Sequence, residues 1–287
     1  MKAIIVSVDY SDILAITLPY NRHHFDEVLV VTSPKDVDTA KVAGANGAEV
    51  FVTDSFYDDG ASFNKWKALE EGFNVLGRYG WICNMDADVL WPRSIRVQEG
   101  LVNLGIGRAG VDLGWCDLSV KPGTLCSPLR RMWNDWPQTP FVGHIVCGSV
   151  PDERDWSGFP IHRNVNEWAG YSQIFHADDP HLGPAPWHEI DWVHAGGADS
   201  FFQRKWPAEC KVRPPFEVLH LGPAGKNWFG RATPLADGTV PDEAPNRLRA
   251  CEEIWRQRRA RERAGLPRFA REKIAPKNPQ EPPLESP

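Results

Sequence analysis

Short apolar strands alternate with segments of helical length through the first third of the chain. The runs Lys2–Val8, Val28–Thr32 and Glu49–Thr53 are rich in β-branched residues, as buried parallel strands are. Each interval between them can hold a crossover helix, and Asp12 or Ser11 is expected to cap the first. The predicted fold class is therefore α/β, with a mostly parallel central sheet flanked by helices. No GxGxxG or GxxxxGK(S/T) motif follows these strands, which excludes a dinucleotide fingerprint and a P-loop.

The segment Trp81–Pro92, WICNMDADVLWP, places two acidic residues at the end of a fourth strand. Its β-capable residues run into Asp86 and Asp88, and Pro92 ends the strand because proline cannot donate to a ladder. Ligands bind at the carboxyl ends of strands in an open α/β sheet. Two carboxylates this close are costly unless a cation or a proton offsets their charge. The sequence therefore predicts a divalent metal site with oxygen ligands that suit Mn²⁺ or Mg²⁺.

A helical pattern over Ser62–Leu76 leads into this acidic strand. Apolar side chains recur at three- and four-residue spacing, with Ser62 as the expected N-cap and Gly77 as the expected stop. Lys65 falls in the first turn, where it could point at phosphates near the strand edge or remain in solvent.

The order of these elements resembles the nucleotide-sugar-binding half of GT-A fold glycosyltransferases, particularly the family 2-like group. Three βα units, the sequence FNKWKALEEG and a strand ending in DAD carry the resemblance, which covers roughly residues 1–230. It implies a Rossmann-like nucleotide-diphospho-sugar transferase fold and an NDP-sugar donor, with a UDP-sugar expected in preference to a GDP-sugar. It also implies that Asp88 binds Mn²⁺ or Mg²⁺ directly, and that Asp86 binds the metal too or reaches the ribose or a metal-bound water.

The second half of the chain supplies further elements in the order that the resemblance requires. Asp199, in the sequence GGAD, occupies the place of the family's catalytic base and could take a proton from an acceptor hydroxyl. As an alternative, Asp199 could cap the helix that follows it. His220, in the β-like run VLHLGP, corresponds to a third metal ligand, although a lone strand histidine can also be a core residue. A base at Asp199 favours inversion by single displacement.

The same resemblance assigns residues around both substrates. Donor-binding residues are expected at strand ends and on the glycine-rich loop, namely Asp9, Tyr10, Asp36, Asp54, Lys65, Asp86, Lys226, Asn227 and Arg231. The last three could close over the diphosphate and neutralise it. The acceptor is assigned to a loop with a small glycine, namely Trp168, Gly170, Tyr171 and Gln173. Other tryptophans of the middle region could meet sugar rings or bases, and core packing is the simpler account for most of them.

The 287 residues are predicted to divide into a catalytic domain and an extension. The domain covers 1–236, with a nucleotide-sugar-binding half over 1–92 and an acceptor half over 93–236. An amphipathic helix and a proline-rich basic tail are expected over 237–287.

The formal charge of −6 is unevenly distributed along the chain. Between Arg247 and Lys277, nine Arg and two Lys stand against four Glu, which leaves about +7 there and about −13 elsewhere. Such a segment could contact nucleic acid or form a solvated helical face. The acceptor therefore stays open among a glycan, a small molecule and a hydroxymethylated nucleic acid.

Composition and cysteine spacing indicate a cytoplasmic protein with reduced thiols. No apolar run approaches about eighteen residues, so no transmembrane segment is expected, and no cleavable signal is recognised. Six cysteines are scattered without a CxxC pair. A structural zinc site remains an alternative for Cys116, Cys126, His144 and Cys147. The sequence does not determine the oligomeric state.

Two other functions remain open. DADVL also resembles the DxDx(T/V) motif of haloacid-dehalogenase-like phosphatases, but that motif normally follows the first strand of its domain. A non-catalytic, Trp-rich carbohydrate-binding protein would keep the fold and bind glycans without metal or nucleotide.

Overall fold

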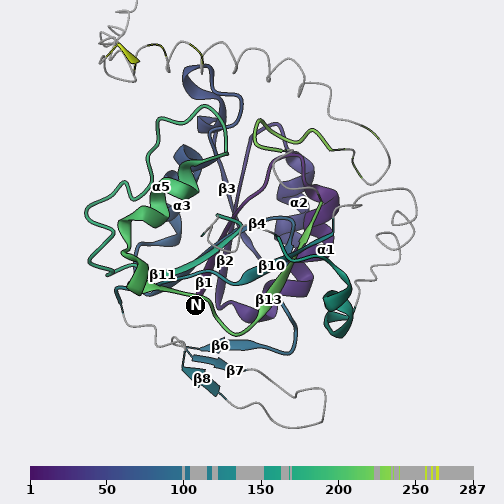
Figure 1. Cartoon of the computed structure of the whole chain (residues 1–287). Helices are drawn as coiled ribbons and strands as arrows, with labels where there is room; N and C mark the ends of the chain where they lie inside the picture. The colour runs from purple at the N-terminus through teal and green to yellow at the C-terminus, as the bar shows by residue number, and fades with distance from the viewer. Residues whose placement is uncertain are drawn as a thin grey trace, which may run out of the picture.

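A computed structural model provides the fold. It describes residues 1–98, 101–103, 115–117, 122–133, 152–162, 168, 170–222 and 227–233, and the isolated positions 235, 239, 256, 260, 263 and 264. Within these residues the centre of the molecule is a seven-stranded sheet in the order β12-β9-β11-β4-β1-β2-β3 (Figure 1). The predicted α/β class is confirmed.

The N-terminal part of the chain contributes four parallel strands to this sheet, and helices connect them. The strands are β1 (Lys2–Val6), β2 (Glu27–Thr32), β3 (Glu49–Val52) and β4 (Trp81–Asp86). The helices are α1 (Ser11–Asn21), α2 (Val37–Ala45) and α3 (Lys65–Leu76), with 3₁₀ turns η1 (Arg22–His24) and η2 (Ser55–Gly60). The βαβ units expected from the apolar runs are therefore present.

Helices cover both faces of the parallel strands. Successive strand residues point to opposite faces, so Ile5 belongs to the core beneath α1 and α2, and Ile4 to the core beneath α3. Helix α3 packs closely on the sheet. A Cβ at Gly72 would lie 2.7 Å from a Val31 methyl and 2.8 Å from an Ile4 methyl. Only a residue without a side chain allows this helix to lie so near the sheet.

The helix ends differ in part from the predictions. Asn64, not Ser62, caps α3, and its side chain accepts a hydrogen bond from the Lys67 amide at 3.1 Å. The Ser62 hydroxyl instead donates to the carbonyl of Val193. Gly77 ends α3 at φ 82°, as predicted.

The predicted cap of α1 is wrong. Tyr10 occupies the N-cap position, without a side-chain capping bond, and Ser11 is the first residue of the helix. Asp12 lies in the first turn, where its carboxylate pairs with a distant arginine described below.

The second half of the chain completes the central sheet and adds two smaller ones. The central sheet gains β9 (Leu125–Cys126), β11 (Ser172–His176) and β12 (Lys211–Val212), with β11 antiparallel to β4. The second sheet consists of β10 (Leu129–Trp133), β13 (Glu217–Leu221) and β5 (Val89–Leu90). The third consists of β6 (Arg96–Gln98), β7 (Leu101–Asn103) and β8 (Trp115–Asp117). The remaining helical elements are η3 (Glu153–Gly158), α5 (Ala198–Phe202), η4 (Gln203–Lys205) and η5 (Ala208–Cys210).

The segment Trp81–Pro92 is not one strand. β4 ends at Asp86, and β5 begins at Val89 in the second sheet. The intervening turn therefore carries the chain from one sheet to the other, and it is this turn that contains the second aspartate of the DAD sequence.

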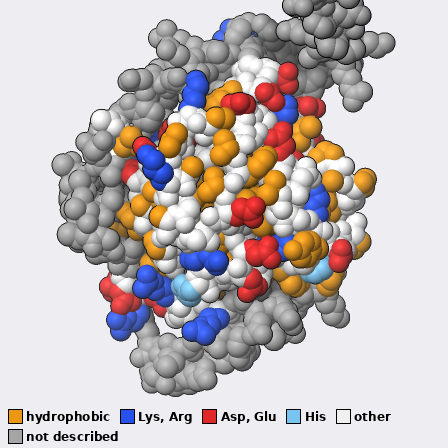
Figure 2. Space-filling view, turned by 180° about the vertical axis from the view of Figure 1, so that it is seen from behind, with side chains coloured by type: hydrophobic (Ala, Val, Ile, Leu, Met, Phe, Trp, Pro, Cys, Tyr) orange, Lys and Arg blue, Asp and Glu red, His pale blue; other side chains and the backbone are white. Residues whose placement is uncertain are grey.

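Some predicted features fall on residues that the structure does not describe. Of the extension over 237–287, only isolated positions are described, and Arg256, Ala260 and Arg263 among them are helical. For the alternative zinc site, Cys126 is a buried free thiol, while His144 and Cys147 lie outside the described residues. No helix in the described ranges has the length and apolar character needed to cross a membrane. The face shown in Figure 2 mixes apolar, acidic and basic side chains, as solvated protein surfaces do.

Candidate active site

Asp86, Asp88 and His220 meet at the carboxyl end of β4. Each offers one potential ligand atom, and these atoms all lie within 4.8 Å of one another. Asp86 is the last residue of β4, and Asp88 follows in the turn to β5. His220 reaches them because β13 pairs antiparallel with β5, with His220 opposite Val89. The structure thus brings together the three residues that the sequence analysis had assigned to the metal.

The chemistry of this cluster fits a divalent cation. Asp88 is only 8% exposed, and its Oδ1 accepts no hydrogen bond from the described residues, at 3.6 Å from Nε2 of His220. Burial raises the pKa of Asp88, His220 lowers it, and the charge of Asp86 raises it again. A cation would offset both carboxylates and give the buried oxygen a partner. Two carboxylates and an imidazole suit Mn²⁺ or Mg²⁺.

Lys65 lies against the same cluster. It is the first residue of α3, it is buried, and its ammonium group forms an ion pair with Asp86. The predicted position at the strand edge is therefore observed, and Lys65 neutralises one of the two carboxylates there.

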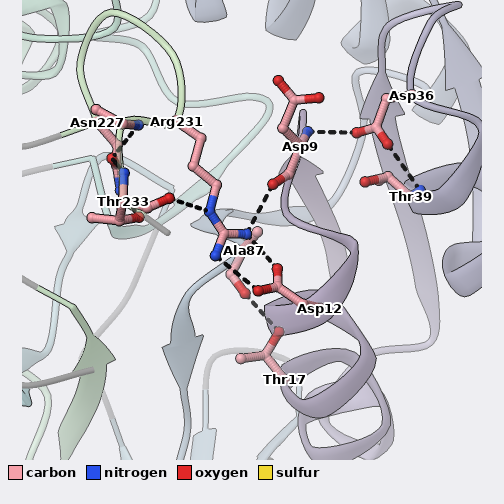
Figure 3. Close-up of polar contacts among 10 residues, drawn as sticks. Asp9, Asp12, Thr17, Asp36, Thr39, Ala87, Asn227, Arg231 and Thr233 are labelled. Carbon is pink, nitrogen blue, oxygen red and sulfur yellow. Dashed lines mark hydrogen bonds and ion pairs between the residues drawn. The ribbon is translucent and has the colours of Figure 1, made fainter. Parts of the chain in front are cut away.

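Side chains of α1 hold the turn between Asp86 and Val89 by hydrogen bonds. The Thr17 hydroxyl donates to the carbonyl of Ala87 at 2.6 Å (Figure 3), and the Asn21 amide donates to the carbonyl of Val89 at 2.7 Å. Asn21 also accepts from the Trp91 amide at 2.9 Å. These bonds fix the backbone that presents both aspartates.

The cluster opens into a cavity of about 530 Å³. Residues from both halves of the chain line it. Those that the sequence analysis had predicted are Tyr10, Lys65, Asp86, Asp88, Gly170, Tyr171, Asp199, His220 and Asn227.

Asp199 is held at the cavity by two backbone amides. Its Oδ2 accepts from Gly170 at 2.8 Å and its Oδ1 from Ser200 at 2.9 Å, and each oxygen can accept a further hydrogen bond. A Cβ on Gly170 would lie 2.9 Å from Cβ of Asp199 and 3.0 Å from the Trp66 ring, so only glycine fits. The N-cap of α5 is Gly197, at φ 96°, so the alternative that Asp199 caps this helix is wrong.

Aromatic side chains form much of the remaining wall. The half-exposed ring of Trp228 covers Gly196, where a Cβ would lie 2.6 Å from the indole. Trp66 donates from its indole to the carbonyl of Ala195 at 2.9 Å. Burial, followed by the charge of Asp88, raises the pKa of Tyr10 well above its ordinary value, so its hydroxyl remains a hydrogen-bond donor.

Arg231 does not line the cavity. It is 1% exposed, and its guanidinium forms a bidentate ion pair with Asp12, with Nη2 to Oδ2 at 2.8 Å (Figure 3). Nη1 also donates to the carbonyl of Asp9 at 2.8 Å, and the guanidinium lies 4.7 Å from the centre of the Tyr10 ring. Its observed role is to join residues 9–12 to residues 227–233, and its assignment to the diphosphate stays a prediction.

Three other predicted donor residues also lie outside the lining. Asp36 caps α2, accepting from the amide of Thr39 at 3.1 Å and from the amide of Asp9 at 2.6 Å. Asp9 has a positive φ of 61°. Asp54 is exposed beyond the end of β3. Lys226 lies outside the described residues.

The predicted acceptor residues divide into two pairs. Gly170 and Tyr171 line the cavity, whereas Trp168 and Gln173 do not. Gln173 is fully buried and donates to the carbonyl of Trp168 at 2.8 Å, and the Trp168 ring lies 4.0 Å from the guanidinium of Arg213.

Sequence reasoning missed several residues of the site. The lining also includes Phe63, Trp66, Arg130, His162, Ser200 and Trp228. Trp66 lies within the sequence FNKWKALEEG and Ser200 directly follows GGAD, so their position was a usable signal. Arg130 and His162 belong to the middle region, where no motif indicated which side chains face the cavity.

Comparisons with known proteins yield structural similarities only. No model of a known family matches the sequence, and no curated protein matches it. The chain is similar to a mannosyl-3-phosphoglycerate synthase from Rubrobacter xylanophilus, at 16% identity over 95% of this chain and 77% of that one, with a TM-score of 0.44. It is also similar to a glucosyl-3-phosphoglycerate synthase from Mycobacterium tuberculosis, at 13% identity over 93% and 81%, with a TM-score of 0.43.

Another structure of the M. tuberculosis enzyme contains Mn²⁺, UDP-glucose and phosphoglyceric acid. It matches at 13% identity over 93% of this chain and 80% of that one, with a TM-score of 0.40.

Proposed function

We propose that this protein is a metal-dependent GT-A glycosyltransferase that moves a sugar from a nucleoside-diphosphate-sugar to an acceptor hydroxyl. The observation that carries the proposal is the presence of two kinds of chemistry in one cavity. Asp86, Asp88 and His220 form a cluster suited to a divalent cation, and Asp199 is a fixed carboxylate suited to proton transfer. An inverting, metal-dependent transfer from such a donor uses both.

The metal cluster would serve the donor. Asp86, Asp88 and His220 would hold Mn²⁺ or Mg²⁺, which when bound supplies positive charge to the leaving nucleoside diphosphate. Lys65 adds a protein cation beside the cluster and can donate to phosphate oxygens. A UDP-sugar remains the expected donor.

Asp199 would serve the acceptor. The amides of Gly170 and Ser200 hold its carboxylate in one orientation, which is what a general base requires. As the acceptor oxygen bonds to the anomeric carbon, its proton passes to Asp199 and the bond to the diphosphate oxygen breaks. A single displacement of this kind inverts the anomeric centre. Proton NMR of the first product formed would show the inverted configuration, and a retained configuration would remove Asp199 from this role.

The half-exposed indole of Trp228 offers an apolar face at the same cavity. Sugar rings present C–H faces that pack on aromatic rings, and Trp228 could hold the transferred sugar in this way. Only isolated positions of the basic segment that suggested a nucleic-acid acceptor are described, so that acceptor is not part of the proposal.

The proposal is tested by calorimetric titration of UDP, GDP and UDP-glucose, each with Mn²⁺ and with a chelator. We expect one nucleotide to bind only with metal, and Asp88→Ala to abolish that binding. Asp38→Ala is the matched control, because Asp38 is an exposed aspartate on α2. If no nucleotide binds under any metal condition, the transferase proposal fails, and phosphatase activity and glycan binding become the next assays.

A further inference from the structure

The cavity lining contains one lysine and one arginine, and they differ in their partners. Lys65 is ion-paired with Asp86. Arg130 has no carboxylate within ion-pair distance in the described part of the chain. Its Nε is buried and makes no hydrogen bond there. An arginine in this state retains donors that a ligand can use.

The surroundings of Arg130 hold it in place without using its hydrogen-bonding capacity. Its guanidinium lies 4.4 Å from the centre of the Tyr171 ring, and the Tyr171 hydroxyl is anchored to the carbonyl of Pro128 at 2.5 Å. The carbonyl of Arg130 accepts a hydrogen bond from the amide of His162 at 3.1 Å, so both residues reach the lining as neighbours. A planar guanidinium held on a ring is preorganised for a planar or tetrahedral oxyanion.

The position of Arg130 relates it to the proton-transfer residue. Tyr171 directly follows Gly170, whose amide donates to Asp199. Arg130 therefore contacts the residue next to the glycine whose amide holds Asp199. The Tyr171 ring also lies 6.4 Å from the ring of His220, which belongs to the proposed metal cluster. The diphosphate of the donor would bind at that cluster, so it is the alternative ligand for Arg130. The cavity must hold both substrates, which favours a small acceptor.

We propose that Arg130, with His162 beside it, binds a phosphate or carboxylate group of the acceptor, so that the acceptor is a small hydroxylated anion. This inference rests on the proposed function only in assigning the anion to the acceptor. Bidentate contact with an oxyanion is the strongest use of a guanidinium. Three carboxylates line the cavity and repel an anion, whereas the positive charge of Arg130 attracts it.

The test uses the full chain and a neutral–anionic series of probes, which are glycerol, glycerate and glycerol phosphate. Calorimetry measures each probe against protein saturated with UDP and Mn²⁺, and against free protein in chelator. We expect both anions to bind and glycerol not to bind. Arg130→Gln should weaken both anions by about tenfold or more, because a charge-assisted bidentate contact is lost. UDP affinity in Mn²⁺ should change by less than about threefold in that variant.

Two further variants control this experiment. Arg154→Gln removes the same charge from an exposed position in the segment that leads to His162, and should match the wild type. Arg130→Lys retains the charge without the planar fork, and should bind the anions with intermediate affinity. If thermal melting shows that Arg130→Gln is unfolded, Arg130→Lys carries the comparison.

The possible results separate this inference from the proposed function. Equal losses of UDP and anion affinity in Arg130→Gln would assign Arg130 to the donor diphosphate and overturn the inference. Anions that fail to bind, or that bind the wild type and the variant alike, would also overturn it. If UDP fails to bind but the anions bind through Arg130, the anion subsite is supported while the transferase proposal falls.

Discussion

Two arginines border the same site, and the fold uses them in opposite ways. Arg231 is buried with a bidentate carboxylate and two backbone carbonyls as its partners. Arg130 rests on an aromatic ring and faces the cavity without a carboxylate among the described residues. A guanidinium whose donors are already used holds chain segments together, whereas one with unused donors is available to a ligand. The location of an arginine near a site is therefore a weaker guide to its role than the state of its hydrogen bonds.

The largest effect should come from breaking the buried pair. Asp12→Ala leaves the guanidinium of Arg231 inside the protein without its carboxylate, which typically costs about 3–5 kcal/mol. Urea unfolding should show this loss in the free energy of unfolding. Asp38→Ala is the control, because it breaks an exposed pair with Lys41 and should change stability little. An Asp12→Ala variant as stable as the wild type would mean that the pair does not hold the fold.

A substitution in the cavity should change the activity of the protein and leave its stability nearly unchanged. Asp199→Asn keeps the shape of the side chain but removes the proposed base, so turnover should fall by about 10²–10⁴-fold. Affinity for UDP with Mn²⁺ should stay within about threefold in calorimetry, because Asp199 is not part of the metal cluster. Unchanged turnover in this variant would show that another group takes the proton.

Lysine substitutions compare the two arginines directly. Arg231→Lys retains the charge but loses the bidentate contact with Asp12, and should lower the free energy of unfolding by about 1–3 kcal/mol. Arg130→Lys should change it by less than about 0.5 kcal/mol, because no buried partner is left behind. Urea unfolding of both variants measures the difference. Equal destabilisation would remove the distinction between the two positions.

The buried imidazole of His24, away from both arginines, should make stability depend on pH. Burial, followed by the charge of His23, lowers the pKa of His24 to about 3. The folded protein thus keeps His24 neutral, while the unfolded chain binds a proton below about pH 6.5. Stability supported by the neutral imidazole is complete above that pH and is lost as the pH falls toward 3.

The expected loss attributable to His24 is about 1–2 kcal/mol between pH 7 and pH 5. Urea unfolding at a series of pH values should show a smaller pH dependence in His24→Phe than in the wild type. His23→Phe, at the exposed neighbouring position, is the control and should change the slope less. Identical slopes for the wild type and His24→Phe would contradict the assignment.

Much of the framework could be read from local patterns. Alternating apolar runs and helix-length intervals predicted the parallel strands, because hydrophobic period and chain direction are local properties. Asp86 and Asp88 were predicted to bind a metal because they follow a strand of an open α/β sheet, and the family resemblance added His220. The structure places the ligand atoms of all three within 4.8 Å. The resemblance also assigned Gly170 to the acceptor loop, and the structure shows that its missing side chain leaves room for Asp199.

Partner choice depended on the tertiary structure. Arg231 and Asp12 are 219 positions apart, and nothing in either neighbourhood indicates that the arginine turns inward. Ser62 failed as a cap because its hydroxyl bonds to Val193, 131 positions away, which left Asn64 to cap α3. Arg130 was overlooked because only folding places it on Tyr171. Local sequence determines which elements form and where strands end, but hydrogen-bond partners far apart in the chain are decided by which surfaces meet when the elements pack.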